Sequence, residues 1–252
     1  MVVTTNGVIL KRRNIGEQDA ILTVLTDDFG LIEASARGVK RTKSKLSAAV
    51  QPFAYSELAL FHTKERYIID HASAVETFYN LRFDVIKVAL ADYLCELVCF
   101  LKPSPEHIFT VKRLLLNTFY LLAENKKQTE FLKAVDELRL MSLSGFMPDL
   151  VCCHNCAAFE KVPLYLDVVQ GILVCDNCRK EGFGDSLFLL TASVLAAMRH
   201  IIYSDDDKLY KFTVSEDSRS MLSRITEQYV LCHAERSFRP LEIYHSLLLE
   251  EL

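Results

Sequence analysis

Two Cys-x-x-Cys pairs constrain the fold of this chain more than any other feature; they are Cys153, Cys156, Cys175 and Cys178. Two residues between the thiols let both sulfurs of a pair face one point from a tight turn. A hairpin that carries the second pair across to the first completes a tetrahedron. Thiolates in this pattern bind Zn²⁺ or an iron–sulfur centre, and the spacing between the pairs is that of a zinc ribbon or knuckle. The alternative is a cluster of reduced thiols in the core.

We predict that the metal is a single structural zinc ion, because four thiolates leave no position for water or substrate. Two neighbouring residues offer other donors. Cys152 with Cys156 is also an allowed spacing, but Cys153 matches the spacing of the second pair and is preferred. His154 lies inside the first pair, and we expect it to be exposed on the turn rather than bound to the metal.

The composition indicates a globular chain from a reducing compartment. The 252 residues allow one large domain or two to three small ones, and 50% apolar residues are enough to bury a core. The remaining cysteines at positions 95, 99 and 232 fall in helical patterns and are interpreted as packing residues, not as a disulfide scaffold. We see no secretory signal and no apolar stretch of about 18 residues, so we expect a cytoplasmic protein without a membrane span.

The net charge of −4 restricts any nucleic-acid role to a local basic patch. Such a patch lies between Glu33 and Glu57, an interval without acidic residues. Its cations, separated by small and polar residues, are Arg37, Lys40, Arg41, Lys43 and Lys45. Further cations on an earlier strand are Lys11, Arg12 and Arg13. A flexible basic loop of this kind pairs with phosphates and releases counterions, and the alternative is a solvated charged surface.

Residues 1–77 show the pattern of five short strands, at about 8–10, 20–25, 31–36, 55–61 and 67–74, with turns between them. This pattern predicts a five-stranded OB-fold barrel, with an SH3-like barrel as the alternative. OB-folds bind single strands with a basic groove and aromatic platforms. The candidate platforms, each more typical of a core position, are Phe53, Tyr55, Phe61 and Tyr67.

From residue 78 onward the apolar period becomes helical, which predicts an α+β multidomain chain. An all-α helical domain has its first part at 78–148 and its second at 184–252, and a four-cysteine, zinc-ribbon-like segment is inserted at 149–183. That segment contains a hairpin that turns near Gly171. Helix starts are indicated by Ser104 with Pro105, by Thr191 and by Ser215. Inward faces include Phe131, Val135 and Leu138, and later Ile243, Leu247 and Leu248; residues 205–207 are expected to be a solvated loop.

Several motifs resemble the RecO family of bacterial recombination mediator and annealing proteins, and their order and spacing cover nearly the whole chain. They are Gly7-Val8-Ile9-Leu10-Lys11-Arg12-Arg13, Ala36-Arg37-Gly38-Val39-Lys40-Arg41, Gln51-Pro52-Phe53, and Gly145-Phe146-Met147-Pro148-Asp149-Leu150 ahead of the cysteine pairs. One departure is Ala157, where the family usually has glycine. A residue there often takes a left-handed conformation.

The resemblance implies a DNA-binding mediator of recombinational DNA repair that is not an enzyme. Such a protein binds single- and double-stranded DNA and anneals complementary strands. The resemblance also implies RecR and the C-terminal tail of the single-strand-binding protein as partners, in the loading of RecA onto covered strands. In that setting the protein is bacterial, cytoplasmic and nucleoid-associated.

Two other functions are alternatives to a DNA-binding mediator: a zinc enzyme and a protein-interaction scaffold. A zinc nucleobase deaminase needs His-x-Glu upstream of its cysteine pair, whereas His233-Ala234-Glu235 lies downstream of both pairs. No Walker motif occurs, so ATP hydrolysis is unsupported. A zinc-containing interaction scaffold without direct DNA binding would recognise an acidic peptide. Its candidate cations, which are also typical of solvated helix faces, are Lys112, Arg113, Lys126, Lys127, Arg139 and Arg199.

Overall fold

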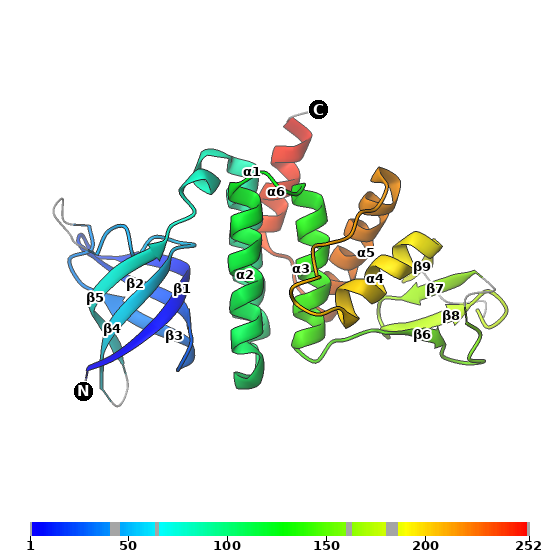
Figure 1. The fold of residues 1–252 in the computed structure, drawn as a ribbon, viewed down its shortest axis with the longest axis horizontal. Coiled ribbons are helices and arrows are strands. Elements are labelled where there is room, and N and C mark those ends of the chain that lie inside the picture. Colours follow the sequence, from blue (N-terminus) through cyan, green and yellow to red (C-terminus); the bar gives the residue numbers. More distant parts are fainter. Residues whose placement is uncertain (1, 41–45, 64–65, 160–162, 180–185, 251–252) are drawn as a thin grey trace. The chain divides into compact units, whose positions relative to one another are not determined.

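The computed structural model describes residues 2–40, 46–63, 66–159, 163–179 and 186–250 (Figure 1). Contacts group the chain into two compact units, of which one is Met1–Lys127 with Phe238–Leu252 and the other is Gln128–Ser237. Both units combine a sheet with helices, so the chain is an α+β protein as predicted. The four-segment division of the sequence stays a prediction about domain boundaries.

Five strands form a closed barrel in the first unit (Figure 1). They are β1 (Val2–Ile15), β2 (Asp19–Thr26), β3 (Gly30–Ala36), β4 (Tyr55–His62) and β5 (Tyr67–Glu76). Their order is β1-β2-β3-β5-β4, and β1 closes the barrel by pairing with β4. β3 and β5 are parallel, and all other neighbours are antiparallel. A five-stranded barrel of this kind is an OB-fold, which confirms the prediction.

Alternating side chains fill the barrel interior, as the period of two requires. The buried set includes Leu22, Val24, Ala34, Ala36, Leu58, Leu60 and Ile69. β1 is long enough to pair with β4 through its first half and with β2 through its second half. Gly7 lies where these two pairings overlap, and a Cβ there would come within 2.7 Å of Val24 Cγ1. Glycine therefore permits the close approach of β1 to β2.

The helices of the first unit are η1 (Tyr79–Phe83), α1 (Val85–Leu101), η2 (Pro105–His107), α2 (Ile108–Ala123) and α6 (Arg239–Glu250). Asp84 caps α1 by accepting hydrogen bonds from the amides of the second and third helical residues. The residue just before α6, Phe238, packs on α1, since the centroid of its ring lies 5.5 Å from that of Tyr93 and 5.8 Å from that of Phe100. The α6 segment thereby returns the end of the chain to the first unit.

Two helix details differ from the sequence prediction. Ser104 precedes the predicted start, but its side chain makes no capping bond and contacts Glu106 at 3.3 Å instead. The first turn is a 3₁₀ helix, and the α-helix begins only at Ile108. In α6, Ile243 is predicted to face inward but is 45% exposed, and Leu247 and Leu248 are half-buried. The buried residues are Pro240, Leu241 and Tyr244. Both apolar sets fit a helical period, so periodicity alone does not choose between them.

The second unit packs three helices with a four-stranded sheet. The helices are α3 (Thr129–Leu143), α4 (Ala192–Tyr203) and α5 (Glu216–Ala234). The sheet has the order β6-β8-β7-β9, from β6 (Asp149–Cys153), β7 (Leu164–Asp167), β8 (Ile172–Cys175) and β9 (Leu187–Leu190). Thr191 and Ser215 cap α4 and α5 as predicted. The β7–β8 hairpin is confirmed, whereas the sequence pattern does not predict β6 and β9.

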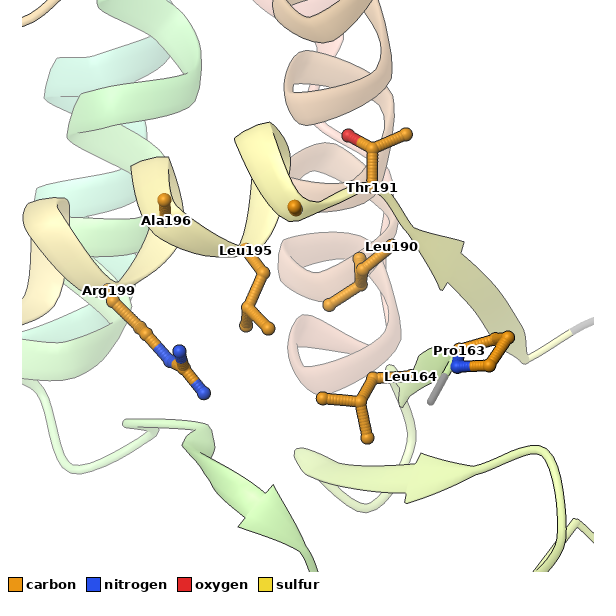
Figure 2. A pocket seen from close by; sticks show the side chains of 8 residues that line it. Pro163, Leu164, Leu190, Thr191, Leu195, Ala196 and Arg199 are labelled. Atoms are coloured by element: carbon orange, nitrogen blue, oxygen red, sulfur yellow. The ribbon is translucent and has the colours of Figure 1, made fainter. Parts of the chain in front are cut away.

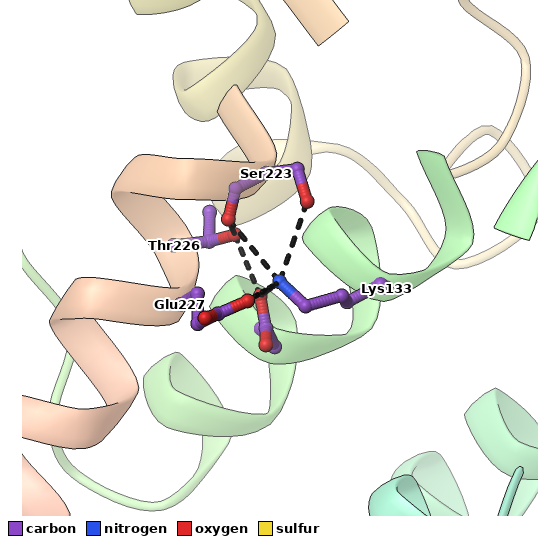
Figure 3. Close-up of polar contacts among 5 residues, drawn as sticks. Lys133, Ser223, Thr226 and Glu227 are labelled. Carbon is purple, nitrogen blue, oxygen red and sulfur yellow. Dashed lines mark hydrogen bonds and ion pairs between the residues drawn. The ribbon is translucent and has the colours of Figure 1, made fainter. Parts of the chain in front are cut away.

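Helices α3 and α5 meet through a buried polar cluster as well as an apolar core (Figure 3). Phe131, Val135 and Leu138 are buried as predicted. Lys133 is also fully buried, and its ammonium contacts Glu137 at 3.1 Å and Glu227 at 2.7 Å. Lys133 also donates hydrogen bonds to the carbonyl and hydroxyl oxygens of Ser223. The Thr226 hydroxyl donates a hydrogen bond to the Glu137 carboxylate.

The acidic run at 205–207 is predicted to be a solvated loop, but its middle residue is half-buried and pairs with a helix side chain. Asp206 accepts a hydrogen bond from Arg139 at 2.8 Å. The same guanidinium donates to the carbonyls of Ile201 and Ile202 at the end of α4. This arrangement satisfies helix carbonyls that lack an intrahelical partner. Among the helices that the structure describes, none is both long and apolar enough to cross a membrane.

Candidate metal centre and nucleic-acid interface

The four predicted cysteines come together at one end of the small sheet. Cys153 and Cys175 are the last residues of β6 and β8, two parallel neighbours. Each strand is followed by a tight turn that brings back the second cysteine of its pair, Cys156 or Cys178. All four Sγ atoms lie within 4.8 Å of one another, and those of Cys156 and Cys175 are 3.6 Å apart. The hairpin between the pairs therefore brings the second cysteine pair next to the first, as the sequence predicted.

The donor set and its spacing suit a tetrahedral thiolate site. Sulfurs at about 2.3 Å from a zinc ion lie about 3.8 Å from one another along the edges of a tetrahedron. The 3.6 Å separation of Cys156 and Cys175 is close to that value. Cys153 and Cys175 are buried, Cys178 is half-buried and Cys156 is exposed. The four clustered cysteines can thus hold a metal ion.

Backbone amides around Cys153 favour its thiolate form. Burial by itself would raise the pKa of the Cys153 thiol, but amide donors from Cys175, Cys156 and Asn155 outweigh burial and lower the pKa to about 6. The Cys175 amide lies 3.3 Å from Cys153 Sγ. Side-chain contacts with Cys156 and Cys175 raise the pKa of Cys178 to about 12. Four thiolates this close repel one another, and a bound cation would offset that repulsion.

The two neighbouring candidates lie outside the cluster. Cys152 is half-buried and His154 is exposed, and neither is among the four grouped donors. His154 contributes through its backbone, because its amide donates to the Leu173 carbonyl at 2.8 Å. Ala157 has φ +56°, the left-handed conformation that glycine favours. Its amide closes the first knuckle by donating to the Cys153 carbonyl at 2.8 Å.

The β7–β8 hairpin is anchored by buried polar contacts. Asp167 is 2% exposed, and its carboxylate accepts from the amides of Val169 and Gln170 in the turn. Gly171 has φ +67°, and a Cβ there would lie 2.8 Å from the Tyr229 hydroxyl of α5. These contacts explain why the turn contains glycine. They also fix the strand that leads into the second cysteine pair.

Exposed cations from two segments lie at the same end of the barrel. Arg13 is exposed near the end of β1, and Arg37 and Lys40 are exposed in the turn after β3. Backbone amides of this turn donate to the Asp19 carboxylate at 2.7 Å and to the Gln18 carbonyl at 3.1 Å. The turn after β3 is thereby held against the β1–β2 connection, at the end of the barrel where Arg13 also lies. The remaining predicted cations of the loop, Arg41, Lys43 and Lys45, lie outside the described residues.

Lys11 and Arg12 differ from the exposed cations. Lys11 Nζ lies 3.6 Å from a carboxylate oxygen of Glu96 on α1, which offsets part of its charge. Arg12 is half-buried, because it lies opposite Leu22 of the barrel interior. The strand thus presents Arg13 to solvent most fully. Alternation along the strand separates Arg12 from its two neighbours, and the Glu96 contact separates Lys11 from Arg13.

The four aromatic candidates have different surroundings. Phe53 belongs to the core, because it is 4% exposed and its ring lies 5.4 Å from that of Phe119. Tyr55 is half-buried, with Lys112 5.3 Å above its ring. Tyr67 packs against the barrel core and is stacked on His62 with centroids 4.4 Å apart. Phe61 is 43% exposed.

Most candidate cations on the helices have partners within their own unit. Lys112 pairs with Asp27, and Lys126 lies 4.3 Å from the ring centre of Tyr120. Arg199 donates to the carbonyls of Leu150 and Val151 and lies over the ring of Phe159. Arg113 is exposed on α2. The deaminase-like His233 lies among aromatic rings, 4.3 Å from that of Tyr229, and is not one of the four clustered donors.

One described pocket lies in the second unit beside Arg199, with a volume of about 450 Å³ (Figure 2). Leu164, Leu190 and Leu195 line its wall, and the Arg199 side chain closes one side. The small side chains of Ala192 and Ala196 on α4 leave its space open. The lining therefore combines apolar side chains with two polar ones, Thr191 and Arg199.

The fold and the cysteine cluster define a class of proteins in which an N-terminal OB-fold barrel precedes helices and a four-cysteine cluster. Comparison of the sequence with family models agrees with this class. Residues 1–78 match the model "Recombination protein O N terminal", and residues 82–242 match "Recombination protein O C terminal". The two models together span most of the chain.

Curated relatives carry one name, DNA repair protein RecO. The relative from Alkaliphilus metalliredigens is 32% identical over 245 residues, which cover 96% of this chain and 98% of that protein. The relative from Symbiobacterium thermophilum is 29% identical over 245 residues, with 96% of both chains covered. The one from Acetivibrio thermocellus is 27% identical over 243 residues, again with 96% of both. The chain belongs to the RecO family of DNA repair proteins.

Proposed function

We propose that this protein is a DNA-binding recombination mediator without enzymatic activity. It binds single- and double-stranded DNA, anneals complementary strands, and acts with RecR to load RecA onto strands covered by the single-strand-binding protein. The observation that carries the proposal is the location of the exposed Arg13, Arg37 and Lys40 at one end of an OB-fold barrel. Membership of the RecO family supports the same conclusion.

The mechanism is electrostatic positioning of a strand. Guanidinium and ammonium groups at the barrel end pair with phosphates and release the counterions that surround them. A strand whose phosphates are partly neutralised repels a complementary strand less, so pairing becomes easier. In this proposal the cysteine cluster binds one Zn²⁺ that supports the fold and takes no part in a reaction.

A salt series tests this proposal by fluorescence anisotropy with labelled single-stranded DNA. The test variant carries Arg13→Glu, Arg37→Glu and Lys40→Glu. Each lost phosphate contact reduces the slope of log K against log salt by about 0.7, so we expect weaker binding and a slope that is shallower by about 2. A strand-annealing assay with the same variant should slow in parallel.

A charge-matched control separates local contacts from overall charge. The control variant changes three exposed cations of the second unit, Lys208→Glu, Lys211→Glu and Arg236→Glu. It should bind DNA with the salt slope of the unaltered protein. Equal losses in both variants would contradict a specific role for the barrel end. An unaltered protein that binds no DNA would overturn the proposed function.

A protein-interaction scaffold is the alternative, and the pocket beside Arg199 favours it. A cavity that places leucine side chains beside the cation of Arg199 can accept an apolar side chain next to a carboxylate. The C-terminal tail of the single-strand-binding protein, implied by the family resemblance, is the partner that we propose for either function. Titration of a labelled acidic tail peptide, with Leu195→Arg as the blocking variant, tests this contact separately from DNA binding.

A further inference from the structure

An outward-facing row of side chains crosses all five strands of the barrel. Arg13 on β1 pairs with Ile21 on β2, and Ile21 pairs with Ser35 on β3. Ser35 pairs with Ile68 on β5, and Ile68 pairs with Phe61 on β4. Paired residues on neighbouring strands share a face of the sheet. Residues far apart in the sequence therefore form one continuous strip.

The neighbours of these residues along each strand show that the strip faces outward. Phe61 follows Leu60, which is fully buried, and Ile68 precedes Ile69, which is 3% exposed. Because side chains alternate along a strand, Phe61 and Ile68 point away from the barrel interior. Val2 lies opposite Phe61 on its other side and is also exposed. The far end of the strip is thus an exposed apolar surface centred on an aromatic ring.

Charged groups are distributed so that cations lie at both ends of the strip. Arg13 is exposed at the first end, and Arg37 is exposed two residues after Ser35, in the turn that follows β3. Arg66 is exposed two residues before Ile68, the partner of Phe61, and its backbone forms hydrogen bonds of 3.0 and 3.2 Å with Thr63. Four steps between strands span about 19 Å along the sheet surface. This distribution suits a ligand with negative charges along its length and flat apolar groups between them.

We propose that single-stranded DNA lies along this strip and that Phe61 is a residue on which one of its bases stacks. The phosphates pair with Arg13 at one end and with Arg66 at the other. Ile21 and Ile68 provide the apolar floor between them. The inference rests on the proposed DNA binding and names the path of the strand on the barrel. Stacking on an aromatic side chain does not depend on base identity, as annealing of arbitrary strands requires.

Two oligonucleotides with equal numbers of phosphates separate stacking from electrostatics. One is oligothymidylate, and the other is a strand of the same length built from abasic sites. We expect the intact protein to bind oligothymidylate about fivefold or more tightly, the effect of one stacked base. Phe61→Ala should remove this preference and leave the affinity for the abasic strand and its salt slope unchanged. Phe61→Tyr should keep the preference, because it keeps the ring.

Phe83→Ala is the matched control, since Phe83 is a 71% exposed phenylalanine on η1 outside the barrel. This variant should retain the preference in full. Equal affinity of the intact protein for the two strands, or a preference that survives in Phe61→Ala, would overturn the stacking role while leaving DNA binding in place. Failure to bind either strand would overturn the proposed function itself and this inference with it.

Discussion

Ala157 adopts a backbone conformation that its methyl group disfavours. Its φ of +56° lies in the left-handed region, immediately after the second cysteine of the first knuckle. An alanine there is strained relative to glycine, because its Cβ crowds the backbone carbonyl. The surrounding knuckle holds it in place through the 2.8 Å bond from its amide to Cys153.

Replacement of this alanine by glycine should stabilise the protein. We expect Ala157→Gly to raise the free energy of unfolding by about 0.5–1 kcal/mol, since relief of the strain exceeds the greater freedom of glycine in the unfolded chain. Urea denaturation of the metal-loaded protein measures the change. Ala158→Gly is the control and should be neutral or destabilising, because Ala158 does not have a positive φ. A lower stability of Ala157→Gly would contradict the strain argument.

Lys133 is a buried charge whose environment stabilises it, because its ammonium group is surrounded by ion-pair and hydrogen-bond partners (Figure 3). Its substitution by methionine leaves the fully buried Glu137 without its cation. We expect Lys133→Met to destabilise the protein by about 3–5 kcal/mol, as for other broken buried pairs. Urea denaturation measures this loss.

The double variant Lys133→Met with Glu137→Leu tests whether the lost stability comes from the unpaired carboxylate that remains buried in the single variant. It should recover a large part of the stability, because neither charge of that pair is then buried. A double-mutant cycle gives the coupling energy between the two positions. If the double variant is as unstable as the sum of the single variants, the cost arises from packing and not from the unpaired carboxylate.

At the scale of elements, the small sheet depends on the cysteine knuckles. β6 and β8 make few regular pairs, with only Asp149 and Cys153 of β6 opposite residues of β8. A bound metal ion would join the ends of both strands through four bonds. Since ligands of this kind are seldom preformed in an unfolded chain, metal binding contributes directly to folding.

Removal of the metal should therefore destabilise the second unit. We expect one zinc ion per purified chain, and a chelator should lower the thermal midpoint by about 10 °C or more. Cys175→Ala should lose the zinc, whereas Cys152→Ala should keep it because Cys152 lies outside the cluster. Metal analysis by mass spectrometry checks both. Loss of zinc from Cys152→Ala would place that residue in the ligand set and contradict the assignment.

At the scale of the whole molecule, a net charge of −4 coexists with a cationic barrel end. The Debye length at physiological ionic strength is about 8 Å, so most acidic residues have little effect at a phosphate bound to Arg13 or Arg37. The overall charge therefore does not preclude DNA binding. It does imply that the contact area is local, which is why the charge-matched variant of the second unit serves as a control.

Local patterns in the sequence were sufficient for several features. The spacing of the four cysteines and the glycine turn between the pairs predicted the cluster. Thr191 and Ser215 marked two helix starts, because a cap is a contact between residues two or three positions apart. Alternation also indicated five short strands. Each of these signals depends on near neighbours in the chain, which the sequence contains directly.

Only the tertiary structure decided how distant segments are paired. The strip from Arg13 to Phe61 depends on the register of five strands, including the parallel pair β3 and β5. The contact of Lys11 with Glu96 and the burial of Lys133 depend in the same way on packing between elements. Periodicity determines which face of a strand or helix is apolar. The neighbour that covers that face is set by chain topology, and a local pattern carries no information about it.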